Sequence, residues 1–208
     1  MVRNPLDMLP SYHQRLVYVR HEDVKDFGKA WSLQEERARG RHIPKVCREP
    51  SLLQYAHVGR LGYHVENLYR KAGEEKCLVI VFDDFVTETE AVYKDVLEFI
   101  DVDFDGPRNF KPKRESKMYR SGLLQRFLYN PPNGAGILIK WYKNSRTRQK
   151  NEKKSRLRRL RKRLLRINSV KGKPPPLNGE IRSVLRETFS SDIKRLEEIL
   201  GRNLSHWR

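Results

Sequence analysis

Two small groups of polar residues in this chain have types and spacings that could serve binding or chemistry. Arg3 stands before Asn4-Pro5, and Ser11 follows eight residues after the arginine. A guanidinium presents a fork of charged donors that suits a phosphate, and a serine hydroxyl near a helix N-terminus can add a further contact. The alternative for this pattern is a purely structural corner, because a turn with proline commonly precedes a helix.

The second group is the pair Asp83 and Asp84, which follows an apolar run. Two neighbouring carboxylates could act as general acid and general base. Carboxylates at such a position more simply accept hydrogen bonds from nearby amides. We therefore expect a structural role for both aspartates, and no catalytic residue is assigned.

The positions of Arg3 and Ser11 depend on a strand, a turn and a helix at the start of the chain. Residues 1–2 predict the end of a strand, which Asn4-Pro5 terminates. Apolar residues at helical spacing predict a helix over residues 7–19, with Ser11 in its first turn. An arginine at a strand end and a serine at the next helix can both face the crevice where α/β proteins bind ligands.

The apolar run from Cys77 to Phe82 predicts a second strand. A run without alternation suits a strand that is covered on both faces, so the expected fold class is α/β with a parallel sheet flanked by helices. The other expected elements are helices over residues 22–39, 52–71, 87–100, 123–128 and 180–200.

The length and composition exclude several classes of protein for this chain. A length of 208 residues suits one domain, or one domain with a tail, and 38% apolar residues suffice for a core. The two cysteines, Cys47 and Cys77, exclude a disulfide framework and a cysteine-rich zinc site. The longest apolar run is far shorter than the roughly 18 residues that cross a bilayer, and we identify no signal peptide.

The net charge of +18 is concentrated in residues 140–173, which hold sixteen Lys or Arg against one acid, Glu152. Leucines at nearly helical spacing predict an amphipathic helix with a narrow apolar stripe, which Pro174-Pro175-Pro176 must end. Two interpretations stay open. The helix is either a solvated one that packs by its stripe, or one that binds an anionic surface such as a membrane, a polysaccharide or a nucleic acid.

Several motifs occur in a fixed order along the chain. They are Val2-Arg3-Asn4-Pro5 with Ser11, Tyr12-His13, Asp26-Phe27, Leu61-Gly62-Tyr63 before a helix from Val65 to Tyr69, the run from Val79 to Phe85, Val92 to Phe99, Val102-Asp103, Pro175-Pro176-Leu177, Ile181-Arg182 and the end from Asp192 to Trp207. In this order and spacing, the chain resembles the PAPS-dependent sulfotransferases of the bacterial and Golgi carbohydrate type, where PAPS is 3′-phosphoadenosine 5′-phosphosulfate. The aspartates Asp83 and Asp84 depart from the family's Glu-Asp pair.

The resemblance implies a fold, a donor and two site residues. The fold is a P-loop-NTPase-like parallel sheet, with residues 1–208 forming a sulfotransferase domain. Arg3 and Ser11 are the residues that would hold the 3′-phosphate of PAPS. The reaction implied is transfer of a sulfuryl group from PAPS to a hydroxyl or amine, with a carbohydrate as the first acceptor class and without a metal.

The family's glycine-rich loop for the 5′-phosphosulfate is missing from this sequence, since no glycine-rich stretch is followed by Lys-Ser or Lys-Thr between a strand and a helix. In the family this loop precedes the arginine motif, and the general base follows the loop. We therefore expect that the first βα unit is absent, that the chain is truncated at its N-terminus, and that it is inactive alone. The expected location is the cytoplasm, although a membrane anchor could lie in the missing part.

The alternative hypothesis is a polyanion-binding protein that uses the basic segment 140–173. Its expected partners are an anionic glycan or a membrane surface. Nucleic acid also belongs to this hypothesis but ranks behind these partners, because the sequence contains no RNP, helix-turn-helix or zinc-finger signature. This hypothesis also leaves Arg3 and Ser11 without a role.

Overall fold

The computed structural model describes residues 1–106, 109–110, 117–129 and 152–208, with the side chains of residues 152–158 excepted. The chain forms two compact units. Unit 1 comprises residues 1–10, 54–114 and 176–208, and unit 2 comprises residues 11–53 and 115–175. The boundary between them falls within the first helix, α1 (Pro5–Val19), so this helix belongs to both units.

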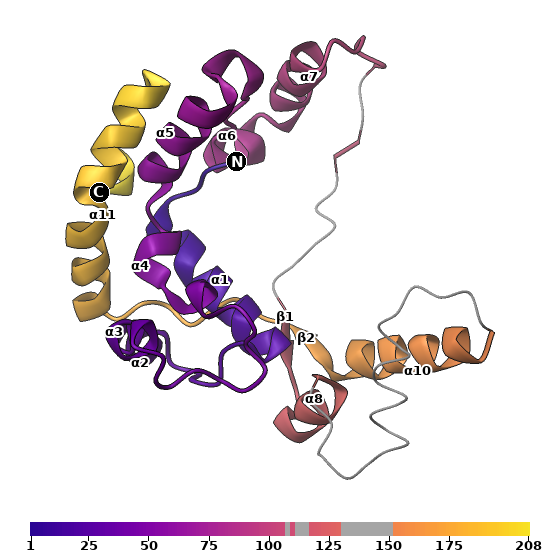
Figure 1. The fold of residues 1–208 in the computed structure, drawn as a ribbon. Helices are drawn as coiled ribbons and strands as arrows, with labels where there is room; N and C mark the ends of the chain where they lie inside the picture. Colours follow the sequence, from indigo (N-terminus) through magenta and orange to yellow (C-terminus); the bar gives the residue numbers. More distant parts are fainter. Residues whose placement is uncertain (107–108, 111–116, 130–151) are drawn as a thin grey trace. The chain divides into compact units, whose positions relative to one another are not determined.

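Helices form most of unit 1. They are α4 (Tyr55–Val58), α5 (Leu61–Ala72), α6 (Phe82–Thr87), α7 (Thr89–Phe99) and α11 (Gly179–Leu200), with the short 3₁₀ helices η2 (Glu74–Lys76) and η3 (Ser205–Trp207). The long helix α11 packs along α5, as Figure 1 shows. The side chains of Leu185, Phe189 and Ile193 form the buried face of α11.

The contact between α5 and α11 is unusually close at Gly62. The Asp192 carboxylate on α11 accepts hydrogen bonds from the backbone amides of Gly62 (2.8 Å) and Tyr63 (3.0 Å), and so caps the first turn of α5. A Cβ atom at Gly62 would lie 2.4 Å from the backbone carbonyl oxygen of Asp192. Glycine is therefore the residue that lets the two backbones approach at this point.

A parallel bridge joins the N-terminus to the apolar run that was expected to be a strand. The Val2 amide donates to the Ile80 carbonyl, and the Phe82 amide donates to the Val2 carbonyl, both at 2.8 Å. This single bridge is parallel, as a pair in the expected sheet would be. The predicted length of the strand is wrong, because helix α6 already begins at Phe82 and the N-terminal partner leaves the extended conformation for α1. A P-loop-like parallel sheet therefore stays a prediction.

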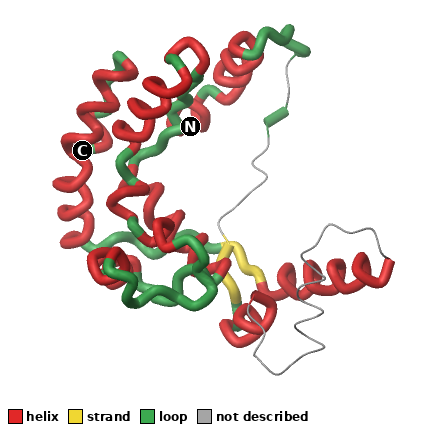
Figure 2. The backbone as a smooth tube through the Cα atoms, in the orientation of Figure 1, coloured by secondary structure: helices red, strands yellow, loops and turns green. Residues whose placement is uncertain are grey.

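Unit 2 contains an antiparallel strand pair that the sequence did not predict. Strand β1 (Lys117–Tyr119) pairs with β2 (Ser169–Lys171), as Figure 2 shows in yellow. Helices α8 (Gly122–Tyr129) and α10 (Glu152–Asn168) adjoin this pair. The basic segment 140–173 thus contains α10 and β2, while its residues 140–151 lie outside the described part of the chain.

Buried hydrogen bonds join these elements of unit 2. The Asn168 amide nitrogen donates to the Gln125 side-chain oxygen at 2.9 Å, and the Gln125 amide nitrogen donates to the Tyr18 carbonyl at 2.6 Å. Both amide side chains are buried. The end of α10 is therefore connected through α8 to α1, since a buried polar group must find its partner inside the protein.

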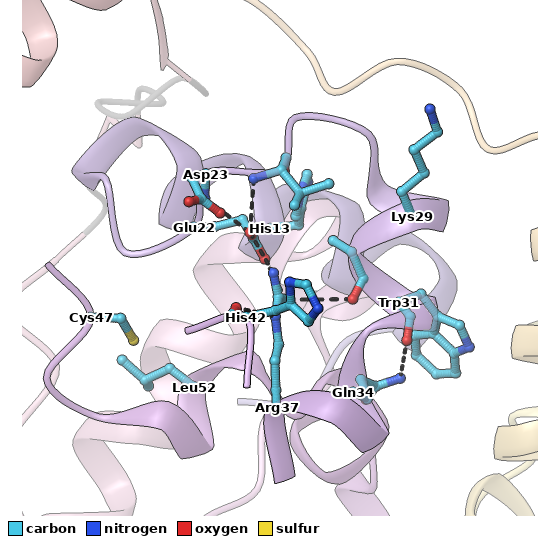
Figure 3. A network of polar contacts seen from close by, with 12 residues as sticks. His13, Glu22, Asp23, Lys29, Trp31, Gln34, Arg37, His42, Cys47 and Leu52 are labelled. Atoms are coloured by element: carbon cyan, nitrogen blue, oxygen red, sulfur yellow. Dashed lines mark hydrogen bonds and ion pairs between the residues drawn. The ribbon is translucent and has the colours of Figure 1, made fainter. Parts of the chain in front are cut away.

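A buried ion pair organises residues 22–42 (Figure 3). The Arg37 guanidinium donates to both Glu22 carboxylate oxygens, at 2.7 and 2.8 Å, and both side chains are fully buried. The same carboxylate accepts from the amides of Asp23 and Val24, and Arg37 also donates to the His42 carbonyl. These hydrogen bonds give both buried charges partners. Without such partners, the burial of the charges would strongly destabilise the folded chain.

The predicted single helix over residues 22–39 is wrong for the same reason. The helices present are α2 (Phe27–Ser32) and α3 (Gln34–Ala38). Glu22 turns inward to Arg37, and Asp26 caps α2 by accepting a hydrogen bond from the Lys29 amide at 2.8 Å. Periodicity could not reveal this, because the ion pair joins side chains that are fifteen residues apart.

The close approach at Gly62 predicts a large effect of a small substitution. We expect Gly62→Ala to lower the free energy of unfolding by about 1–3 kcal/mol, because the added methyl group meets backbone rather than a movable side chain. Urea unfolding followed by circular dichroism measures this change. Gly179→Ala in α11 is the matched control, since its Cβ meets nothing within 4 Å. Equal stability of the two variants would contradict the packing described for α5 and α11.

Candidate functional site

Arg3 lies where the parallel bridge ends and helix α1 is about to begin. Its guanidinium carbon lies over the Phe82 ring, 4.6 Å from the ring centroid. This cation–π contact orients the side chain and leaves the in-plane N–H donors for other partners. Among the residues with described side chains, no carboxylate forms an ion pair with Arg3. The structure therefore offers an oriented cation whose charge is not matched by an acid within the described part of the chain.

The backbone around Arg3 is fixed on both sides. Before it, Val2 is buried and makes the two hydrogen bonds of the parallel bridge. After it, the Asn4 side-chain oxygen accepts from the Leu6 amide at 2.9 Å, and the Asn4 carbonyl accepts from the Asp7 and Met8 amides. The helix start is thus capped by Asn4, in the manner of an Asx turn.

Ser11 lies in the second turn of α1 and is half-buried. The predicted first turn is wrong, because capping by Asn4 starts the helix at Pro5 rather than at residue 7. Ser11 is also the first residue of unit 2, whereas Arg3 belongs to unit 1. A joint contact of the two side chains with one phosphate therefore stays a prediction.

The residues that follow Ser11 fasten this part of α1 within unit 2. The Tyr12 hydroxyl donates to the Leu52 carbonyl at 3.0 Å, the His13 Nε2 atom lies 2.9 Å from the Val24 carbonyl oxygen, and the Gln14 amide donates to the Gly172 carbonyl at 3.0 Å. Burial raises the pKa of Tyr12 to about 12, and burial also lowers the pKa of His13. Both groups are therefore uncharged near neutral pH and serve as anchors.

Asp83 and Asp84 lie in the first turn of α6, and both bind the C-terminal end of the chain. The Trp207 indole donates to Asp83 at 2.8 Å, and His206 Nε2 lies 3.2 Å from the same oxygen. Asp84 pairs with Arg202, whose hydrogen bond holds the pKa of that carboxyl below its usual range. Both carboxylates therefore have side-chain partners at the C-terminus rather than the nearby amides that were expected, and their purely structural role stays a prediction.

A small open hollow borders the residues that precede α6. Its wall is mostly apolar, and its charged members are Asp84, Asp95 and Arg202. Arg202 is bound to Asp84 there, so its charge is already matched. The hollow is therefore a poorer binding site for an anion than the surroundings of Arg3. Among residues with described side chains, no group of three or more His, Cys, Asp or Glu is placed to hold a metal ion.

Sequence reasoning did not find Phe82 as the partner of Arg3. The two residues are far apart in the chain, and only the register of the parallel bridge brings them together. The apolar run gave part of the information needed to find this contact, because Phe82 is its last residue.

The described helices contain no stretch that is long and apolar enough to cross a bilayer.

Comparisons with known proteins identify one similar structure. No protein-family model matches the sequence, and no curated protein matches it. The crystal structure of a sulfotransferase from Alicyclobacillus acidocaldarius is similar, with a TM-score of 0.58 and 22% sequence identity. The match covers 100% of this chain and 56% of that chain. The resemblance is thus confirmed for the fold, and this chain spans little more than half the length of the sulfotransferase.

The buried His13 predicts a loss of stability in mild acid. Its lowered pKa keeps it neutral in the folded chain, while the unfolded chain binds a proton near the ordinary value of about 6.5. The contribution of His13 is therefore complete above about pH 6.5 and is lost as the pH falls through that value toward the folded pKa.

Urea unfolding at about pH 7.5 and about pH 5.5 tests this on the parent chain, on His13→Asn and on His57→Asn, an exposed control. We expect a smaller difference between the two pH values in His13→Asn alone. An identical pH dependence in all three chains would contradict the prediction.

Proposed function

We propose that this chain is part of a PAPS-dependent sulfotransferase and that Arg3, together with Ser11, binds the 3′-phosphate of PAPS. The observation that carries the proposal is the position of Arg3. This residue directly follows Val2 of the parallel bridge, and its guanidinium lies over the Phe82 ring. The likeness in fold to a sulfotransferase extends over the whole chain and supports the same function.

The local chemistry fits a phosphate at Arg3. A guanidinium forms short, charge-assisted hydrogen bonds with phosphate oxygens and can form two at once. The amides of Leu6 and Asp7, which a bare helix start would offer to an anion, are already bound to Asn4. Recognition would therefore depend on the side chains of Arg3 and Ser11 rather than on free backbone amides of α1.

The reaction class follows from the family that the fold suggests. PAPS would supply a sulfuryl group, and the acceptor would present a hydroxyl or amine, with a carbohydrate as the proposed acceptor class. We assign no general base to this chain, since Asp83 and Asp84 are bound to the C-terminal residues. The proposed role of the chain is to hold the adenosine 3′-phosphate.

Binding of adenosine 3′,5′-bisphosphate tests the site directly. We expect Arg3→Ala to weaken binding by about tenfold to a hundredfold, because a charge-assisted hydrogen bond is lost. Isothermal titration calorimetry measures the affinity. Arg60→Ala is the matched control, since Arg60 also stacks over an aromatic ring, Tyr63, at 4.8 Å but belongs to no proposed site.

The serine is tested in the same assay. Ser11→Ala should weaken binding less than Arg3→Ala, by about fivefold to tenfold, because a neutral hydroxyl contributes a weaker hydrogen bond. Equal affinities of the parent chain, Arg3→Ala and Ser11→Ala would overturn the proposed phosphate site.

A second measurement concerns turnover. We expect no PAPS-dependent sulfation of carbohydrate acceptors by the 208-residue chain alone, because its sequence lacks a glycine-rich loop for the phosphosulfate. Radiolabelled sulfate transfer is the assay. Detectable transfer would show that this expectation is wrong while leaving the binding test intact.

A further inference from the structure

The helix α10 has two kinds of exposed side chain between residues 159 and 168. Four cations are exposed, and we call them the basic face: Arg159, Lys162, Arg163 and Arg166. Two large aliphatic residues are also exposed, and we call them the apolar edge: Leu160 and Ile167. Among the residues with described side chains, no carboxylate forms an ion pair with the basic face.

The inward side of α10 is defined by other residues. The Arg161 Nε atom donates to the Leu128 carbonyl at 3.1 Å, and its guanidinium lies over the Tyr129 ring at 5.4 Å. Asn168 is buried and bonds to α8. The helix therefore already packs within unit 2 by this side. The apolar edge is only partly covered by that packing, since Leu160 is 48% exposed and Ile167 is 56% exposed.

The two residues of the apolar edge lie on one side of the helix. Leu160 and Ile167 are seven residues apart, which is close to two helical turns, so both point to the same side. Arg163 lies between them on that side, three residues after one and four before the other. The half-buried Leu164 adjoins the apolar edge. Cations and aliphatic groups therefore border each other on one surface.

This combination discriminates between anionic partners. A nucleic acid or a polysaccharide would neutralise the basic face but would leave the apolar edge in water. A bilayer with anionic lipids offers both phosphate headgroups for the cations and an acyl boundary for the aliphatic side chains. Long Arg and Lys side chains can keep their charges at the headgroups while their stems remain in the apolar layer.

We propose that α10 binds the surface of an anionic lipid bilayer, with its apolar edge in the acyl boundary and its basic face at the headgroups. Each cation near such a surface strengthens binding by about fivefold, so four of them are sufficient for measurable recruitment. The helix lies along the bilayer, as amphipathic helices of low overall hydrophobicity do. The proposal does not depend on the phosphate site at Arg3.

The test is co-sedimentation of the full chain with vesicles. We expect binding to phosphatidylcholine vesicles that contain phosphatidylglycerol, and at least about tenfold weaker binding to phosphatidylcholine alone. The double variant Leu160→Gln/Ile167→Gln should weaken binding to the anionic vesicles by at least about tenfold, with its charge unchanged. Arg163→Gln/Arg166→Gln should weaken it by a similar or larger factor.

A matched control is available on the other unit. Leu68 on α5 and Val184 on α11 are 47% and 39% exposed, so Leu68→Gln/Val184→Gln removes two exposed aliphatic groups elsewhere. Binding equal to that of the parent chain is expected for this control. Circular dichroism shows whether each variant keeps its helix content.

Heparin and duplex DNA, immobilised, provide the competing partners. We expect Leu160→Gln/Ile167→Gln to bind heparin and DNA as tightly as the parent chain does, because binding to these polyanions depends on charge alone. Unchanged vesicle binding of that variant would overturn the proposal and leave a purely electrostatic surface. Binding of the parent chain to heparin or DNA without binding to the anionic vesicles would also overturn it.

Discussion

The parallel bridge between Val2 and Val81 is the interaction on which the candidate site depends. It consists of two backbone hydrogen bonds, and both valines are buried, so water does not compete for these groups. The bridge ends at Arg3 on one side and at Phe82 on the other. It therefore places the guanidinium over the ring and directs the chain into α1. Loss of this pairing would release both the cation and the helix start from their positions.

The charges of the chain divide into matched and unmatched ones. Arg37 is neutralised by Glu22 in the interior of unit 2, and Arg202 is neutralised by Asp84 in unit 1. These pairs hold segments that are distant in sequence, and their charges are not available to a ligand. Arg3 and the exposed cations of α10 have no acidic partner among the residues with described side chains. We therefore place both proposed functions at unmatched cations.

The two proposed anion sites differ in the neighbours of their cations. Arg3 stands next to an aromatic ring and a capped helix start, where one oriented guanidinium suits a single phosphate group. The cations of α10 stand next to Leu160 and Ile167, where several charges and apolar groups share an extended surface. The proposed nucleotide site and the proposed membrane-binding surface are thus distinguished by the geometry and the neighbours of their cations rather than by net charge.

Local patterns predicted two of the long helices well, whereas the helix expected over residues 52–71 is divided into η1 (Pro50–Leu53), α4 and α5. The helix expected over residues 180–200 is α11 (Gly179–Leu200), and Gly201 ends it with a φ of 59°, a left-handed conformation that glycine adopts without strain. The helix expected over residues 7–19 is α1, which begins two residues earlier because of Asn4. Periodicity and capping act within a few residues, so the sequence alone determines them. Arg3 and Ser11 were identified as candidates by the same local spacing and by the resemblance.

Only the tertiary structure decided which partners the polar residues have. Glu22 and Arg37 were expected on one helix. In the structure Glu22 turns inward to pair with Arg37, so residues 22–26 are not helical and α2 begins only at Phe27. The hydrogen bond from Trp207 to Asp83 and the cation–π contact of Arg3 with Phe82 join residues far apart in the chain. The same holds for the pairing of β1 with β2, whose short strands have no distinctive pattern. Such contacts depend on packing between distant segments, which no spacing within a single segment can specify.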